Sequence, residues 1–406
     1  MKSNTLRALA LTISLLLLLT ACRRVTQPDF TVDTTTDTAQ KDTTTVDTTA
    51  EDTTASVPEE IPDTSVTISM VGDVLLHEKV ADSGKMADGT YNYDHLFANV
   101  KDHITKADIA IANQEVILGG RDMGLSGYPC FNGAFEVGDA LAAAGFDIIL
   151  HATNHTLDRG TRAVQNCMTF WGTSYPDITV LGIHADRESQ ERLYVREENG
   201  IRIAFLNYTY GTNGIPLPSD MPYIVDILTA ERLRRDIAKA EEIADFTVVL
   251  PHWGTEYVLT PDNNQKYWAN IMLDCGADLV IGTHPHVIEP IEILTDGENS
   301  MLVYYSIGNF INATAQTGEG IADRMVGGIA NVTIDKDENG EAYISDYGVT
   351  PIVTHVLSGS GAITTYKLSD YTKELAGENE IIASDPAFSL EYCKDLAEKV
   401  FGDNAE

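Results

Sequence analysis

The sequence is poor in basic residues. Its 406 residues include 27 Lys and Arg against 61 Asp and Glu, which gives a formal net charge of -34 at pH 7. Nucleic-acid binding requires clustered Lys and Arg that neutralise phosphates, so this composition excludes nucleic acid as a partner. It also disfavours a substrate that is held mainly by charge, unless metal ions supply the positive field.

Cysteine is scarce as well, with five residues in the chain. Four of them follow residue 65, and none has the spacing of a metal site. In an oxidising compartment they either pair as disulfides or serve as small buried residues, and the sequence leaves both alternatives open. These four are Cys130, Cys167, Cys275 and Cys393.

Long hydrophobic runs are also missing, apart from residues 8–19 near the N-terminus, which follow Lys2 and Arg7. This run is too short for a permanent membrane span and predicts a signal peptide of residues 1–21. It ends in Leu-Thr-Ala before Cys22, which resembles a lipobox, where the cysteine is acylated after cleavage. We therefore predict a lipoprotein, anchored through Cys22 to the extracellular face of the cell membrane.

The next segment, residues 22–64, is dominated by Thr and Asp. Such a composition offers little apolar surface to bury, so it predicts a disordered tether. From about Ser65 the composition becomes that of a globular domain.

Predicted strands and helices alternate in this globular part, which indicates an α/β fold. We expect strands at 66–71, 107–112, 147–150, 202–208, 246–250 and 277–281. We expect helices at 93–107, 135–144, 160–171, 229–244 and 264–274. Further strands are predicted at 288–294, 301–307, 328–334 and 342–349, and the residues Asp337-Glu338-Asn339-Gly340 predict a hairpin between the last two.

Metal-capable side chains follow five of these strands, and their convergence is the strongest functional signal in the sequence. In open α/β sheets ligands bind at the carboxyl edge, so we expect these residues at one edge of one sheet. Carboxylate, carboxamide and imidazole groups together suit Mn, Fe or Zn, and two such ions can clamp the oxygens of a displacement at phosphorus. The residues are Asp73, Glu115, Asn154, His155, His252, His284 and His286.

The strings around these residues carry a family resemblance. They are Gly72-Asp73-Val74-Leu75-Leu76, Asn113-Gln114-Glu115, Thr153-Asn154-His155-Thr156-Leu157-Asp158-Arg159-Gly160, Pro251-His252-Trp253-Gly254-Thr255-Glu256-Tyr257, Gly282-Thr283-His284-Pro285-His286-Val287 and Tyr305-Ser306-Ile307-Gly308-Asn309-Phe310. In this order they resemble the motif set of the CapA family of capsule and poly-γ-glutamate biosynthesis proteins. That family is similar to calcineurin-like metallophosphatases, which implies a four-layer α/β/β/α sandwich for residues 65–372 and leaves 373–406 as a C-terminal extension.

The resemblance also implies roles for single residues. A first metal ion would be bound by Asp73, Glu115 and His286. A second ion would be bound by Glu115, Asn154, His252 and His284. His155 would be an uncoordinated general acid near the leaving group. Asp158 would either orient His155 or cap the surface before Gly160.

Four more residues are candidates for the pocket. The broader phosphatase pattern places a histidine at the position of Leu75, so one imidazole is missing; His77, two positions on, is the candidate replacement. Trp253 and Glu256 follow a predicted ligand and are expected to shape the pocket. Asn309 either reaches the site or satisfies its own loop.

The resemblance implies a metal-dependent hydrolase or transferase in the synthesis, export or anchoring of an anionic capsule polymer such as poly-γ-glutamate. Its substrate would be this polymer or a phosphoester. The alternative is a non-catalytic, polymer-handling subunit of a membrane capsule synthase complex. Turnover that is lost with a chelator and regained with Mn, Zn or Fe distinguishes the enzyme from the subunit.

Overall fold

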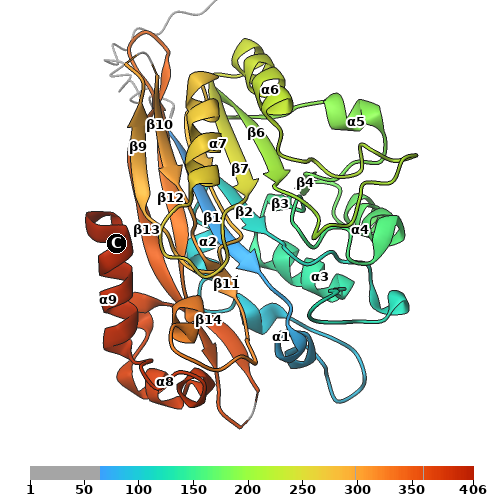
Figure 1. Ribbon diagram of the computed structural model, residues 1–406, viewed down its shortest axis with the longest axis vertical. Coiled ribbons are helices and arrows are strands. Elements are labelled where there is room, and N and C mark those ends of the chain that lie inside the picture. Colours follow the sequence, from blue (N-terminus) through green and yellow to red (C-terminus); the bar gives the residue numbers. More distant parts are fainter. Residues whose placement is uncertain (1–64, 298, 360) are drawn as a thin grey trace, which may run out of the picture. The chain divides into compact units, whose positions relative to one another are not determined.

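Two β-sheets lie at the centre of the computed structural model (Figure 1), which describes residues 65–297, 299–359 and 361–406. All of these belong to one compact unit, Glu60–Glu406. The predicted signal peptide, Cys22 and the Thr/Asp-rich tether lie outside the described residues.

The first sheet combines a parallel part with an antiparallel part. Neighbouring strands from β1 to β4 run parallel, β12 to β14 are joined to β1 as an antiparallel meander, and β11 (Asn309–Ile311) pairs in parallel with the end of β1. The strand order is β14 (Ile363–Lys367), β13 (Ala342–Val356), β12 (Val326–Lys336), β1 (Val66–Val74), β2 (Ile109–Asn113), β3 (Ile148–Leu150) and β4 (Thr179–Leu181).

The second sheet is apolar on both faces, because successive side chains of a strand point to opposite sides. In β7, Val248 belongs to the core between the sheets, whereas Val249 faces a second apolar cluster on the outer side. Its central strands β6, β7, β8 and β10 are parallel, as expected for a sheet buried on both sides. The order is β5 (Tyr194–Glu198), β6 (Ile201–Thr209), β7 (Phe246–His252), β8 (Leu279–Ile281), β10 (Ser300–Tyr304) and β9 (Ile291–Thr295).

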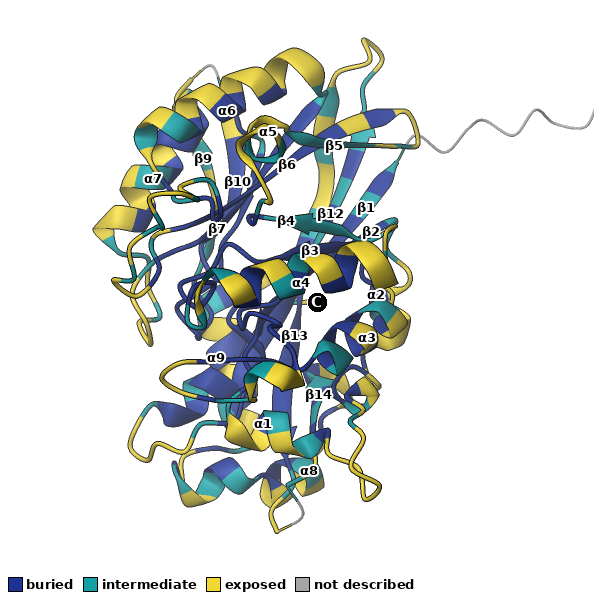
Figure 2. Ribbon diagram, turned by 90° about the vertical axis from the view of Figure 1, so that its right-hand side faces the viewer, coloured by how far each residue is buried: buried dark blue, intermediate teal, exposed yellow. Residues whose placement is uncertain are grey.

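Helices cover the outer faces of both sheets (Figure 2). Buried residues of α6 (Ala230–Ile243) and α7 (Asn263–Asp274) complete the outer cluster of the second sheet. On the first sheet the cover is formed by α3 (Phe135–Ala144), α4 (Gly160–Ser174) and α9 (Leu390–Phe401). The predicted four-layer α/β/β/α sandwich is therefore confirmed. Short helices complete the chain: α1 (Glu78–Ser83), α2 (Lys101–Ile104), α5 (Arg187–Glu191) and α8 (Lys373–Glu378).

The helix predicted at 93–107 is wrong. The chain forms only a 3-10 turn, Asp94–Leu96, and the four-residue α2 there. Between them, the ring of Phe97 stacks on Phe310 and meets the edge of Phe146, so packing against the sheet interrupts the helical periodicity. Among the described residues, no helix has both the length and the apolar character that crossing a membrane requires.

The C-terminal residues 373–406 pack on the same core as the rest of the unit. Cys393 and Phe401 of α9 are buried in it, and Ala405 forms a bridge with Val349 of β13. All four described cysteines are free thiols, of which Cys167 and Cys393 are buried and Cys130 is exposed.

Candidate metal centre

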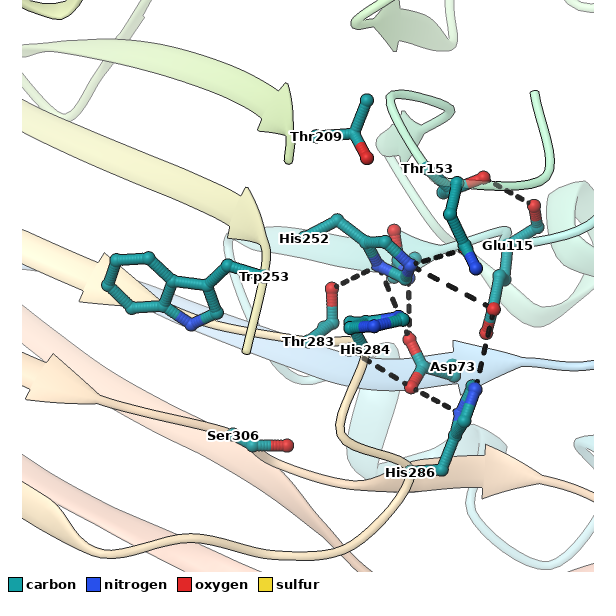
Figure 3. A network of polar contacts seen from close by, with 12 residues as sticks. Asp73, Glu115, Thr153, Thr209, His252, Trp253, Thr283, His284, His286 and Ser306 are labelled. Carbon is teal, nitrogen blue, oxygen red and sulfur yellow. Dashed lines mark hydrogen bonds and ion pairs between the residues drawn. The ribbon is translucent and has the colours of Figure 1, made fainter. Parts of the chain in front are cut away.

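The predicted ligands meet in one cluster, where the carboxyl ends of β1, β2, β3, β7 and β8 converge (Figure 3). The expectation of a single sheet edge is wrong, because β1 to β3 belong to the first sheet and β7 and β8 to the second. Packing the sheets face to face brings their two carboxyl edges together. The site therefore lies at an edge that both sheets share.

Asp73, near the end of β1, is completely buried and linked to three neighbours. Its Oδ1 accepts a hydrogen bond of 2.7 Å from the Asn113 amide. Its Oδ2 lies 3.1 Å from Nδ1 of His286 and 3.3 Å from the backbone nitrogen of His284. The carboxylate thus holds both histidines of the loop after β8.

Glu115 follows β2 and places its carboxylate among three imidazoles. Oε1 lies 3.6 Å from Nε2 of His286, and 3.8 Å from Nε2 of both His252 and His155. Both Glu115 oxygens are buried without a hydrogen-bond partner among the described residues. Burial raises the pKa of this carboxyl well above its usual value. Buried carboxylates normally have partners, so this one calls for a cation.

His252 and Asn154 present adjacent donor atoms. Nε2 of His252 lies 3.0 Å from Oδ1 of Asn154, and its Nδ1 lies 3.0 Å from the Thr283 hydroxyl. The ring of His284 is 4.8 Å from that of His252, and its buried Nδ1 has no partner among the described residues. Burial lowers the pKa of both histidines well below its usual value, which favours the neutral imidazole that binds metals.

The loop after β8 is strained where it carries its ligands. His284 and His286 have φ angles of 102° and 59°, in the left-handed region that non-glycine residues rarely adopt. Such strain is typical of functional sites, where it aims side chains at a common point. Ligand atoms of Glu115, His284 and His286 all lie within 4.8 Å of one another. Together with the orphaned Glu115 oxygens, this donor set fits a divalent metal ion.

His155 stands at the margin of the cluster and is held by Asp158. Its Nδ1 lies 2.6 Å from Oδ2 of Asp158, which also accepts the backbone N–H of Phe131 at 2.8 Å. The Phe131 ring packs edge-on against the imidazole at 4.6 Å. Of the two alternatives for Asp158, the structure therefore shows the contact to His155, and it leaves Nε2 directed toward Glu115.

The other pocket candidates differ in their placement. Asn309 reaches the site, since its Oδ1 lies 3.1 Å from Nδ1 of His286. Glu256 is exposed. Against the effect of burial, the carboxylates of Glu115, Asp73 and, to a smaller extent, Glu256 raise the pKa of His286 to about 9. Trp253 corrects our expectation: it points away from the cluster in Figure 3, lies in the outer apolar core and donates to the Tyr305 carbonyl at 2.9 Å.

His77 lies beside the cluster but does not join it. In the described part of the chain its imidazole has no hydrogen bond to any predicted ligand, and its ring contacts that of Phe131 at 5.3 Å. Burial lowers the pKa of His77 to about 4, and the positive charges of His286, His155 and Arg324 act in the same direction. Its role as a replacement ligand stays a prediction.

The loop after β6 contributes two residues that had not been predicted from the sequence. Asn213 accepts a hydrogen bond of 3.2 Å from the Asn154 amide, and its own amide lies 3.3 Å from Nδ1 of His155. The ring of Tyr210 is 4.7 Å from that of His284. Both belong to the loop after β6, and the one signal for it was the turn residue pair Asn213-Gly214.

Residues 67–314 match the family model described as bacterial capsule synthesis protein PGA_cap. The chain belongs to this family. It is 27% identical over 271 residues to the PGA biosynthesis protein CapA of Bacillus subtilis (strain 168), which covers 61% of this chain and 64% of that protein. It is 27% identical over 261 residues to the capsule biosynthesis protein CapA of Bacillus anthracis, covering 61% and 59%. The match to the family model confirms the predicted resemblance. The aligned region spans less than two thirds of the length of either PGA_cap relative.

Solved structures similar to this PGA_cap protein include phosphoesterases. The calcineurin-like phosphoesterase YfkN from Bacillus subtilis is 13% identical, with a TM-score of 0.40, over 82% of this chain and 99% of that one. The NAD nucleotidase from Haemophilus influenzae is 10% identical, with a TM-score of 0.45, over 84% and 63%. The fold assignment rests on the four layers described above.

Proposed function

We propose that this protein is a metal-dependent hydrolase or transferase of the cell envelope, acting on an anionic capsule polymer or on a phosphoester. It would be attached to the extracellular face of the membrane by acylated Cys22. The observation that carries the proposal is the Glu115 carboxylate, which is buried among three imidazoles with neither oxygen hydrogen-bonded among the described residues. The names of the Bacillus relatives support the capsule polymer as substrate.

The residues that would hold one or two divalent ions, Mn, Fe or Zn by donor chemistry, are Asp73, Glu115, Asn154, His252, His284 and His286. When bound, such ions supply Lewis-acid stabilisation of the negative charge that develops on the reacting group. The chain itself contributes proton transfer. With Asp158 as acceptor, Nδ1 of His155 donates a hydrogen bond, so the second proton of the imidazolium would lie on Nε2 and pass from there to a leaving group, which leaves the ring neutral.

An aromatic rim supports binding of an extended substrate. Tyr210 and Tyr257 are 45% and 41% exposed, and their rings lie 4.7 Å from His284 and 5.9 Å from His286. Tyr128 is 69% exposed beside Phe131. Exposed aromatic side chains next to a polar cluster are typical of ligand-binding surfaces.

The test separates ligation from proton transfer. Metal content and hydrolysis of a phosphodiester and of poly-γ-glutamate are measured for the wild type and for three variants, His252→Ala, His155→Ala and the control His95→Ala. We expect His252→Ala to lose metal, because one of a few ligands is removed. His155→Ala should keep its metal and lose about 10²–10⁴-fold in rate.

His95→Ala should match the wild type, and a chelator should abolish turnover reversibly. Wild-type metal content in His252→Ala would contradict the assigned site. Full activity of His155→Ala would remove its role as an acid. A metal-loaded wild type that binds polymer without turnover would favour the alternative, a polymer-handling subunit of a synthase complex.

A further inference from the structure

Arg324 is a buried arginine that forms no ion pair with any described residue. It lies on the 3-10 helix Ile321–Met325, between β11 and β12, and is 7% exposed. Its Nε is buried without a hydrogen-bond partner, and no carboxylate of the described residues pairs with its guanidinium. By contrast, the half-buried Arg196 and Arg232 each pair with two carboxylates. In a protein with a net charge of -34, an unpaired buried cation is unexpected and needs a reason.

Neutral groups hold the guanidinium in place. Its central carbon lies 3.4 Å from the ring centroid of Tyr257, and Nη1 donates a hydrogen bond of 2.7 Å to the Gln316 amide oxygen. Stacking on an aromatic face and bonding to an amide fix the planar fork without compensating its charge. The guanidinium is therefore fixed in place without an ion pair among the described residues, and Glu256 and Asp323 act on its charge only from beyond ion-pair distance.

This position is beside the candidate metal centre. The backbone nitrogen of Tyr257 donates to the carbonyl of Pro285, between the two histidines of the loop after β8. The Tyr257 ring lies 5.9 Å from that of His286. The Asn309 amide donates both to the Arg324 carbonyl and to the His286 carbonyl, each at 3.0 Å. Arg324 is thus connected to the candidate metal centre through both Tyr257 and Asn309.

We propose that Arg324 binds an oxyanion of the substrate next to the metal centre, in the form of a phosphate or a carboxylate group. The inference rests on the proposed function, and it names the part of the site that recognises negative charge. A planar guanidinium forms paired, charge-assisted hydrogen bonds to either group, which a lysine ammonium cannot reproduce. The oxyanion would supply the negatively charged partner that the guanidinium lacks among the described residues.

The test uses purified wild-type protein with metal bound, and the variants Arg324→Gln, Arg324→Lys and Arg121→Gln. Arg121 is the matched control, because its guanidinium also lies over a tyrosine, Tyr91, at 5.2 Å but pairs with Glu136. Calorimetric titration with inorganic phosphate and with a short γ-linked glutamate peptide gives Kd for each protein. Metal content and thermal unfolding are measured in parallel.

We expect Arg324→Gln to bind one or both ligands about tenfold to hundredfold more weakly, with unchanged metal content. A larger loss for phosphate would assign the site to a phosphate group, and a larger loss for the peptide to a carboxylate. Arg324→Lys should weaken binding by about tenfold, since it keeps the charge and loses the fork. If Arg324→Gln does not fold, the lysine variant decides.

The proposal would be overturned if folded Arg324→Gln and Arg324→Lys bound both ligands with wild-type Kd values. It would also be overturned if the wild type bound neither ligand. Failure of the proposed function has a different signature. A wild type that binds the anions but hydrolyses neither polymer nor phosphodiester refutes the hydrolase. Weakened binding in Arg324→Gln would still support the anion site in that case.

Discussion

Two buried glutamates with orphaned oxygens show how the surroundings of a residue decide its chemistry. Burial raises the pKa of both carboxyls, but Glu115 has three imidazoles within 4 Å of Oε1, so a cation bound among these donors would stabilise its charged form. Glu289, three residues after His286, has no cationic group in contact among the described residues. Its Oε2 accepts from the Gln265 amide and its Oε1 has no partner there. Burial raises the pKa of Glu289 to about 8, so near neutral pH this carboxyl is largely protonated.

Glu289→Gln should therefore change how stability depends on pH. The folded pKa of Glu289, about 8, exceeds its ordinary value of 4.5, so the folded state binds more protons between these values. Its contribution to stability is fully present below about pH 4.5 and is lost as the pH rises through 8. The glutamine stays neutral and avoids this loss. From pH 6 to pH 9, the free energy of unfolding of the wild type, measured with urea, should fall by about 2–3 kcal/mol relative to that of the variant.

The matched control is Glu338→Gln, at the exposed turn between β12 and β13. It should follow the wild type at both pH values. Parallel pH profiles for Glu289→Gln and the wild type would show that Glu289 ionises as readily in the folded protein as in the unfolded one.

Some candidate ligands could be predicted because each of them lies at the carboxyl end of a strand or within three residues after it. Asp73, Glu115, His252 and His284 were identified in this way, and the structure brings them together. Arg324 lies on a 3-10 helix before a strand and Asn213 four residues after one, and neither was selected by the strand-end pattern of metal-capable side chains, so only tertiary packing shows that they lie at the site. The prediction for Trp253 was wrong because neighbours in sequence do not share a face of the sheet. It is adjacent in sequence to His252, but successive residues at a strand end point to opposite sides of the sheet.

At the scale of the elements, local signals predicted the helices well. The helix 135–144 ends at Gly145, whose φ of 100° only glycine adopts easily, and α3 has the predicted bounds. The turn Asp337-Glu338-Asn339-Gly340 joins β12 and β13 as expected. Partition of the strands between two sheets was not predictable from local pattern, because parallel pairing is a long-range contact that the sequence of one strand does not encode.

The contact between Gly72 and Gly308 tests how closely β1 and β11 pack at the site. A Cβ on Gly72 would lie 1.9 Å from the carbonyl oxygen of Gly308, the residue before β11, where β11 pairs with the end of β1 at Asp73. Gly72→Ala must push these segments apart. We therefore expect the free energy of unfolding, measured with urea, to fall by about 1–3 kcal/mol and the metal content to be reduced. The control is Gly172→Ala in α4, where a Cβ meets nothing within 4 Å.

The control variant should gain about 0.5–1 kcal/mol, because alanine loses less conformational freedom than glycine in a helix. Wild-type stability of Gly72→Ala would contradict the tight packing of β1 against β11. Full metal content in a destabilised Gly72→Ala would instead show that Asp73 tolerates the shift.

At the scale of the whole molecule, charge distribution governs encounter with the proposed substrate. A net charge of -34 repels an anionic polymer at long range, and salt screens that repulsion. Attraction must then come from a few local cations at short range. The metal ions that the donor cluster is proposed to hold, and the Arg324 guanidinium proposed to bind an oxyanion, are groups of this kind.

Anchorage sets where this encounter takes place, and Cys22 is the residue on which the prediction depends. If the thiol is acylated, about 0.8 kcal/mol per buried CH₂ of lipid holds the protein on the membrane. Cys22→Ser removes the acceptor while keeping the size of the side chain. We expect wild-type protein in the membrane fraction, with a mass that includes the lipid, and the variant in the medium or still carrying residues 1–21.

Control protein with Cys130→Ser, which alters an exposed thiol of the folded unit, should remain with the membrane. Wild-type protein recovered unlipidated from the medium would contradict the anchor and leave the metal centre untouched.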